Sequence, residues 1–350
     1  MKGIVYHGPQ DFRVEQVPDA KLASDGDALV RVSRTAICGS DLHAWHGPPM
    51  PFRGHVMGHE FLGVVEETGR DVQGFRKGDR VLASCTTACG RCDLCARGQW
   101  AGCRETTAAG GLLSNVYGNP LLQGAQAEAV RVPFADVNLF ALPESLDDEQ
   151  ALFLSDILPT GFMGAEMAGV RPGDVVVVFG CGPVGLFAQR GAALFGAASI
   201  VVVDLDAERL ERARASGAIP VQPEDLEARV LELSDGRGAD AVIEAVGREE
   251  LLHDAIRIAR PGATIAAIGV VASGSISLPF ISGIFAKNLT LRSGLVAPQR
   301  YVPQLLPLVE SGRIDPTEII THRLPLDDGA RGYRIFANHE EGALKVVLTP

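Results

Sequence analysis

The sequence has no apolar run of the roughly 18 residues that a membrane-spanning helix needs. Its opening stretch, MKGIVYHGPQ, also lacks the apolar core of a secretory signal. Basic residues are in the minority, because 32 Lys and Arg face 43 Asp and Glu and leave a formal net charge of −11. This charge repels nucleic acids and anionic membrane surfaces, so neither is an expected partner. We expect a cytoplasmic protein.

Internal repeats and low-complexity segments are absent as well. A chain of 350 residues holds about two domains of ~150 residues each, and its 46% hydrophobic and 21% charged residues are ordinary for a globular protein. Glycine is in excess, with 40 residues or about 11% against a usual ~7%. Many backbone positions must therefore need a positive φ or a close approach.

The pattern of apolar residues changes along the chain. Up to about residue 142, short β-branched runs broken by Gly, Pro and Asp predict a β-rich, loop-heavy domain. From Asp174, apolar strands alternate with helical segments, which is typical of a doubly wound α/β domain with a parallel sheet covered on both faces. The predicted strands are 175–179, 200–203, a short one near 219, 241–244, 264–268 and 289–292, and the predicted helices are 183–195, 207–215, 225–233 and 249–259. A helix over 302–311 and a strand over 343–348 follow without a core of their own, so we expect this tail to return to the first domain.

A glycine-rich turn follows the first strand of the α/β region. Gly180, Gly182 and Gly185 have the GxGxxG spacing, and Pro183 stands where a proline opens a helix without losing a hydrogen bond. Such a turn lets backbone N–H groups approach a pyrophosphate at the positive end of the helix. Tight packing alone is the other interpretation of these glycines.

The strand after this turn ends in Asp204, which lies 19 residues beyond Gly185. A carboxylate there can bind the two ribose hydroxyls of an adenosine and repels a 2′-phosphate, so we expect NAD rather than NADP. A helix cap is the alternative role for this residue. Arg209, one helical turn onward, is expected beside the ribose or, alternatively, on the solvated surface.

Four cysteines form a compact cluster. Cys89, Cys92, Cys95 and Cys103 are separated by two, two and seven residues, which lets four thiolates converge on one zinc ion and leaves no position for substrate. The predicted site is therefore structural. An iron–sulfur cluster is the competing interpretation. Cys85, just upstream, is expected to be a small buried residue.

A third group of residues is dispersed. The segment CGSDLH begins at Cys38, GHE spans residues 58–60, and Asp156 lies far along the chain. A lone Cys or His is usually a core residue. However, GHE followed by Gly63, Gly69 and Val72 fits the zinc alcohol dehydrogenase signature, and the four-cysteine lobe and glycine turn follow in that family's order. From about residue 30 to its end, the chain resembles a zinc-dependent medium-chain alcohol dehydrogenase.

This resemblance implies a catalytic zinc held by Cys38, His59 and Asp156, with water or substrate in the fourth position. Glu60 approaches the metal behind these ligands in the family. Many members have Cys as the third ligand, whereas Asp156 is similar to the bacterial secondary-alcohol and formaldehyde dehydrogenase branches. A carboxylate is an accepted zinc ligand.

The resemblance also assigns roles around the substrate and cofactor. Ser40 and His43 match the family's proton relay, although a helix cap and a surface histidine are their alternatives. Thr160 and Val184 match positions that contact the nicotinamide, and Lys345 matches one that helps to hold the pyrophosphate. The mostly apolar stretch 44–52 is expected to border the substrate pocket, which favours small apolar or aromatic alcohols.

The implied organisation is a β-rich GroES-like catalytic domain over 1–156 with a structural zinc lobe at 85–104, a six-stranded Rossmann domain for NAD over 157–296, and a return to the catalytic domain over 297–350. The implied function is interconversion of a primary or secondary alcohol and its aldehyde or ketone, by a homodimer or homotetramer with two zinc ions per chain. A polyol dehydrogenase, a non-catalytic NAD-binding redox sensor and a zinc hydrolase are the alternatives.

Overall fold

The computed structural model describes residues 1–47, 52–108, 114–271 and 275–350. The chain forms two compact units, of which unit 1 comprises Met1–Pro159 and Val296–Pro350 and unit 2 comprises Thr160–Leu295. Among the described helices, none combines the length and the apolar character needed to cross a membrane.

Unit 2 is built on a six-stranded parallel sheet, with the strand order β11-β10-β9-β12-β13-β14. Every residue of β9 is buried, as expected for a strand with helices on both faces of its sheet. This confirms the predicted doubly wound fold. The strands are β9 (Val175–Phe179), β10 (Ser199–Val203), β11 (Ile219–Val221), β12 (Ala239–Glu244), β13 (Ala259–Ala267) and β14 (Thr290–Ser293).

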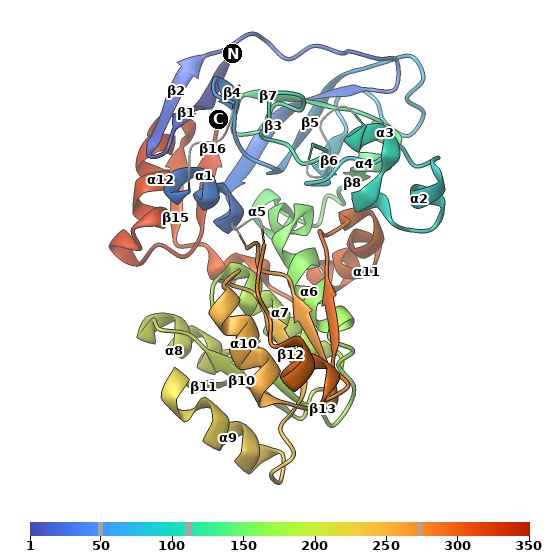
Figure 1. The fold of residues 1–350 in the computed structure, drawn as a ribbon. Coiled ribbons are helices and arrows are strands. Elements are labelled where there is room, and N and C mark those ends of the chain that lie inside the picture. The colour runs from blue at the N-terminus through green and yellow to red at the C-terminus, as the bar shows by residue number, and fades with distance from the viewer. Residues whose placement is uncertain (48–51, 109–113, 272–274) are drawn as a thin grey trace. The chain divides into compact units, whose positions relative to one another are not determined.

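The helices of unit 2 pack on this sheet (Figure 1). From β9 the chain winds outward through β10 to β11, then returns to β12 on the other side of β9. The carboxyl ends of β9 and β12 therefore flank the point where ligands bind in such sheets. The helices are α7 (Pro183–Leu194), α8 (Ala207–Ala215), η4 (Pro223–Asp225), α9 (Leu226–Leu233), α10 (Glu249–Ile258) and the π-helix η5 (Phe280–Phe285), and α6 (Ile157–Met167) contains the boundary between the units.

Unit 1 contains two sheets. The smaller has the order β2-β1-β4, and the larger has the order β15-β16-β3-β5-β6-β8, with β7 also paired to β3. The C-terminal strand β16 pairs antiparallel with residues 35–37 of β3, so the red and blue ends of the chain lie side by side in Figure 1. The strands are β1 (Lys2–Gly8), β2 (Asp11–Gln16), β3 (Ala28–Ile37), β4 (His55–Val56), β5 (Glu60–Thr68), β6 (Arg80–Ala83), β7 (Ala129–Val132), β8 (Leu139–Ala141), β15 (His322–Pro325) and β16 (Val346–Thr349).

Short helices surround these sheets. The helix predicted over 302–311 begins earlier, at Pro298, because a proline is well suited to the first position of a helix. The helices of unit 1 are η1 (Gly39–Asp41), α1 (Leu42–His46), α2 (Asp93–Ala96), η2 (Trp100–Gly102), α3 (Arg104–Thr107), α4 (Ala135–Asn138), α5 (Asp148–Leu152), η3 (Phe153–Ser155), α11 (Pro298–Glu310), η6 (Pro316–Ile319), η7 (Leu326–Asp328), α12 (Gly329–Ala337) and η8 (Glu340–Gly342).

Candidate active site and metal centres

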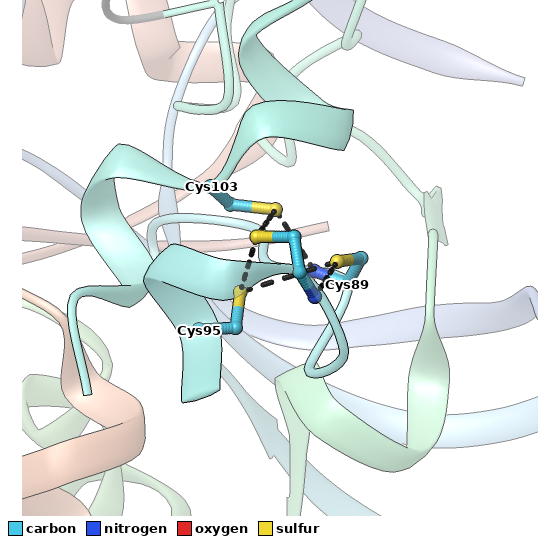
Figure 2. A group of neighbouring side chains, drawn as sticks. Cys89, Cys95 and Cys103 are labelled. Atoms are coloured by element: carbon cyan, nitrogen blue, oxygen red, sulfur yellow. Dashed lines mark hydrogen bonds between the residues drawn. The ribbon is translucent and has the colours of Figure 1, made fainter. Parts of the chain in front are cut away.

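The four clustered cysteines converge in a lobe of unit 1. Figure 2 shows the sulfur atoms of Cys89, Cys95 and Cys103 turned toward one another. The Sγ atom of Cys92 lies 3.5 Å from that of Cys95 and 3.9 Å from that of Cys103, and the Sγ atoms of Cys89 and Cys95 are 4.0 Å apart. A tetrahedral zinc with Zn–S bonds of about 2.3 Å spaces its sulfurs by about 3.8 Å. The four thiols therefore fit a single zinc ion.

Backbone N–H groups stabilise thiolates in this lobe. Cys89 donates its N–H to the sulfur of Cys103 over 3.2 Å, and Cys92 donates to the sulfur of Cys89 over 3.3 Å. Backbone hydrogen bonds, chiefly from Cys95, lower the pKa of the Cys92 thiol to about 6. All four sulfurs lie within 4.8 Å of one another, which encloses one ion and leaves no room for the several irons of a cluster.

A second group of ligand atoms lies elsewhere in unit 1. One donor atom each from Cys38, His59, Glu60 and Asp156 lies within 4.8 Å of all the others, and all four side chains are buried. Cys38 directly follows β3, His59 directly precedes β5, and Asp156 lies between η3 and α6. The pairing of β3 with β5 brings the first two together.

The spacing of these donors suits a metal ion. Oδ2 of Asp156 lies 3.1 Å from Nε2 of His59 and 3.6 Å from Sγ of Cys38. Zinc bonds of about 2.0–2.3 Å place tetrahedral donors about 3.3–3.8 Å apart. The mixed sulfur, nitrogen and oxygen set is also one that zinc accepts.

Asp41 links two of these ligands, a role that the sequence analysis did not assign. Its Oδ2 accepts the backbone N–H of Cys38 over 3.0 Å, and its Oδ1 lies 3.4 Å from Nδ1 of His59. This carboxylate faces Nδ1 and so leaves Nε2 of His59 for a metal. The CGSDLH segment contains Asp41, but only the fold shows that it reaches His59.

Burial and charge set the proton affinities of the ligands. Burial, with the nearby carboxylates of Glu60 and Asp156, raises the pKa of the Cys38 thiol to about 11. Burial would lower the pKa of His59, but Asp41, Cys38 and Asp156 outweigh it and raise that pKa well above its ordinary value. A metal must therefore displace protons from this site, and its affinity falls as the pH falls.

Lys345 forms a buried ion pair with Glu60. Its side chain is fully buried in unit 1, where Nζ lies 2.7 Å from Oε1 of Glu60, donates to the carbonyl of Ile37 over 2.9 Å and lies over the ring of Phe153. Burial disfavours its charge, but Glu60 outweighs this and raises the pKa of Lys345. Lys345 is therefore paired inside unit 1, and its expected contact with a pyrophosphate stays a prediction.

Glu60 has one oxygen free beside the ligand cluster. While Oε1 is paired with Lys345, Oε2 is buried and has no hydrogen-bond partner among the described residues. An unpartnered buried carboxylate oxygen is costly, and a bound cation would compensate for it. Glu60 is therefore placed to contact a metal held by the other three residues of this group.

Ser40 and His43 follow Cys38 closely in the chain. Ser40 also lies beside His59 in space. The hydroxyl of Ser40, in η1, lies 3.3 Å from Nε2 of His59. His43 follows in α1 and is half-buried, and burial lowers the pKa of its imidazole. At neutral pH the ring is therefore uncharged and can accept a proton.

Two further expectations concern the surroundings of this site. Cys85 is buried, as expected, and its backbone N–H donates to the carbonyl of Ser155, beside Asp156. It belongs to neither ligand group found among the described residues. The apolar stretch over 44–52 includes residues 48–51, which lie outside the described residues, so its place at a substrate pocket stays a prediction.

The glycine turn of unit 2 joins β9 to α7, and each of its glycines meets a different constraint. Gly180 has φ of +95°, which favours glycine. A Cβ atom on Gly185 would lie 1.9 Å from the carbonyl oxygen of Gly180, whereas one on Gly182 would meet no atom within 4 Å. Packing of the protein therefore explains Gly185 but leaves the space at Gly182 for a ligand, as in dinucleotide-binding turns. Pro183 opens α7, followed by Val184.

Asp204 lies directly beside this turn. Its Oδ2 accepts the backbone N–H of Cys181 over 2.7 Å, and its Oδ1 accepts that of Asp206 over 3.0 Å. Arg209 is largely buried in α8, with Nε 3.7 Å from a carboxylate oxygen of Asp206. Thr160 begins unit 2 in α6, and the next residue of that helix packs against α7.

Comparison with known proteins agrees with this geometry. Residues 24–144 match the alcohol dehydrogenase GroES-like domain, and residues 183–311 match the zinc-binding dehydrogenase family. An uncharacterized zinc-type alcohol dehydrogenase-like protein of Bacillus subtilis is 36% identical, with all of both chains covered. The chain belongs to the zinc-dependent medium-chain alcohol dehydrogenase family.

Two further relatives support an oxidoreductase that acts on alcohols. The solved structure of the alcohol dehydrogenase TADH from Thermus sp. ATN1 is 41% identical, with a TM-score of 0.91 over 100% of this chain and 99% of that one. The NADP-dependent isopropanol dehydrogenase of Thermoanaerobacter brockii is 33% identical and covers 85% of this chain and 84% of its own. This protein is accordingly an alcohol dehydrogenase that uses zinc and a nicotinamide cofactor.

The geometry of the glycine turn predicts that substitution of Gly182 affects cofactor binding, whereas substitution of Gly185 affects stability. Gly182→Ala places a methyl group in open space, so the melting temperature should stay unchanged while the dissociation constant for the cofactor rises tenfold or more. Gly185→Ala forces a Cβ atom onto the Gly180 carbonyl and should destabilise the fold by about 1–3 kcal/mol or more. Cofactor titration and thermal unfolding measure the two effects. Unchanged cofactor affinity in Gly182→Ala would contradict the assignment of the turn.

Proposed function

We propose that Cys38, His59 and Asp156 hold the catalytic zinc and that the turn at Gly182 holds the pyrophosphate of NAD. When bound, zinc supplies a Lewis acid that lowers the pKa of an alcohol, and the nicotinamide supplies the hydride acceptor. The observation that carries this proposal is the 3.1 Å and 3.6 Å spacing of the Asp156 carboxylate from His59 and Cys38.

Ser40 and His43 move the substrate proton in this proposal. The Ser40 hydroxyl lies 3.3 Å from Nε2 of His59, so it can accept a hydrogen bond from an alcohol at this site. His43 follows one helical turn later and is uncharged near neutral pH, because burial lowers its pKa. It can therefore take up the proton and release it to solvent.

Lys345 and Glu60 keep the charge of the site in balance. Their ion pair neutralises one carboxylate beside Cys38 and Asp156, which leaves the free oxygen of Glu60 able to face the metal when a ligand leaves. The pair lies in the interior, where a single unpaired charge would cost several kcal/mol. The pyrophosphate contact expected of Lys345 is kept as a proposal beside this role.

The second zinc is structural in our proposal. Four thiols at spacings close to those of a tetrahedral zinc site leave no open position for water or substrate. The ion stabilises a lobe whose helices, α2, η2 and α3, are very short.

We also propose that NAD is the preferred cofactor. Asp204 directs its carboxylate to the backbone of the glycine turn, where a 2′-phosphate would meet a negative charge. The relative from Thermoanaerobacter brockii is named for NADP, so the preference rests on this side chain. Thr160 and Val184 remain the proposed nicotinamide contacts, and Arg209 is proposed near the ribose.

A homodimer or homotetramer, built through unit 2, completes the proposal. Strand β14 ends the sheet and all four of its residues are exposed. Phe280, Ile281 and Phe285 of the preceding η5 are also exposed, by 61%, 70% and 67%. A second copy offers the same open strand edge and the same apolar surface, so the two can cover each other. None of the seven cysteines is in a disulfide, which agrees with the proposed location in a reducing cytoplasm.

Removal of the third ligand tests the zinc assignment. Asp156→Ala should lower turnover by more than about a hundredfold, since a direct ligand matters more than the outer partners whose loss typically costs 10–100-fold. Cofactor affinity should not change, because the turn lies in unit 2. The control Asp327→Ala removes an exposed carboxylate of unit 1 and should match the wild type. If Asp156→Ala keeps its activity and its zinc, Asp156 is not a ligand.

Asp204→Ser tests the cofactor preference. A carboxylate and a phosphate ~4–5 Å apart near a protein surface repel each other by a few kcal/mol. The ratio of kcat/KM for NAD to that for NADP should therefore fall tenfold or more in this variant. The control Asp206→Asn removes a neighbouring charge but keeps an oxygen that can cap α8, and should shift the ratio much less. An unaltered ratio in Asp204→Ser would count against its ribose role.

A further inference from the structure

A buried hydrogen-bond chain extends from the proposed zinc site to the C-terminal part of unit 1. Tyr333, in α12, donates its hydroxyl to Oε1 of Gln126 over 2.7 Å. The amide of Gln126 donates to Oδ2 of Asp41 over 3.3 Å and to the carbonyl of Ala36 over 3.2 Å. Asp41 in turn contacts the backbone of Cys38 and faces Nδ1 of His59.

The chain has a direction that the chemistry of its members fixes. A carboxylate such as Asp41 accepts hydrogen bonds only, so Gln126 must turn its NH₂ group toward it. The amide oxygen then faces Tyr333, whose hydroxyl is the donor it needs. With the amide reversed, its oxygen would face the Asp41 carboxylate in the interior, and two acceptors would repel each other. Asp41 and the carbonyl of Ala36 thus fix the amide orientation, and Tyr333 supplies the donor that the amide oxygen needs in that orientation.

Gln126 also contacts the backbone next to His59. The backbone N–H of Gln126 donates to the carbonyl of Met57 over 2.9 Å, and the backbone N–H of Ala125 donates to the carbonyl of Gly58. A Cβ atom on Gly58 would lie 2.3 Å from Cγ of Gln126. The glycine before His59 is therefore required by the packing of this side chain, in addition to its φ of +93°.

Packing holds the ring of Tyr333 independently of its hydroxyl. The ring stacks on Phe12 with 4.2 Å between centroids and lies parallel to Trp45 at 6.2 Å. Tyr333 and Gln126 are both fully buried. Loss of the hydroxyl alone would therefore leave the ring in place and the amide without its donor.

We propose that Gln126 and Tyr333 are positioning residues for the zinc site, which hold Asp41 so that it fixes the ring of His59 and the backbone of Cys38. The proposal rests on the proposed function, in which His59 and Cys38 bind zinc. It assigns helix α12 a part in metal binding. Removal of the Tyr333 hydroxyl from this helix should weaken zinc binding at the other end of the hydrogen-bond chain. Partners of metal ligands typically change metal affinity by about 10–100-fold.

The test compares the zinc affinity of the wild type and Tyr333→Phe, by competition with a chromophoric chelator from fully loaded protein. Tyr333→Phe should raise the dissociation constant of one of the two zinc ions about tenfold. The control Tyr117→Phe also removes a buried hydroxyl from unit 1, but one with no hydrogen-bond partner among the described residues, and should change neither constant. Cobalt substitution adds a readout, since visible bands of Tyr333→Phe should shift with the ligand geometry.

A second variant separates positioning from stability. Gln126→Met keeps the volume and removes the amide, and it should weaken the same zinc ion. Unchanged dissociation constants and cobalt spectra in both Tyr333→Phe and Gln126→Met, in protein that binds two zinc ions, would overturn the inference and leave the proposed function intact. If Asp156→Ala removes no zinc, the proposed site itself is wrong, and the inference with it.

Discussion

Unit 1 concentrates groups of like charge in its interior, where water cannot solvate them. Around the proposed zinc site, the buried carboxyl groups are those of Asp41, Glu60 and Asp156, the buried thiols are those of Cys38 and Cys85, and the groups that can carry a positive charge are His59 and Lys345. Lys345 neutralises Glu60, and His59 lies between two carboxylates. Burial and the carboxylates of Glu60 and Asp156 therefore disfavour the thiolate form of Cys38 and raise its pKa to about 11, although His59 offsets part of this effect. A dication bound among these donors would compensate for their excess negative charge.

This constraint explains how the rest of unit 1 is arranged. The proposed ligands come from the end of β3, the start of β5 and the junction after η3. The C-terminal strand β16 pairs with β3 and so brings Lys345 to Glu60. The four thiols of the cysteine lobe also converge on one position, where they would enclose an ion completely. A ligand set that leaves one coordination position for water or substrate suits a catalytic zinc, whereas one that fills all four positions suits a structural zinc.

Local patterns in the sequence predicted much of this arrangement. The alternation of apolar strands and helices predicted the doubly wound sheet, because each element shows its own period. The cysteine lobe and the glycine turn are also local, with all their residues within one short segment. The ion pair of Lys345 with Glu60 was missed, because a position in the chain does not tell whether a long side chain points to the surface or the interior. Asp41, Gln126 and Tyr333 were missed, since a chain of contacts between residues up to 207 positions apart has no local signature.

The number of zinc ions per folded chain tests the central claim most directly. Native mass spectrometry of the zinc-loaded protein can count them in the wild type, in Cys38→Ala, in Cys92→Ala and in the double variant that carries both substitutions. Our account predicts two ions in the wild type, one in each single variant and none in the double variant. A wild-type chain with one zinc, or a Cys38→Ala chain that keeps two, would contradict it.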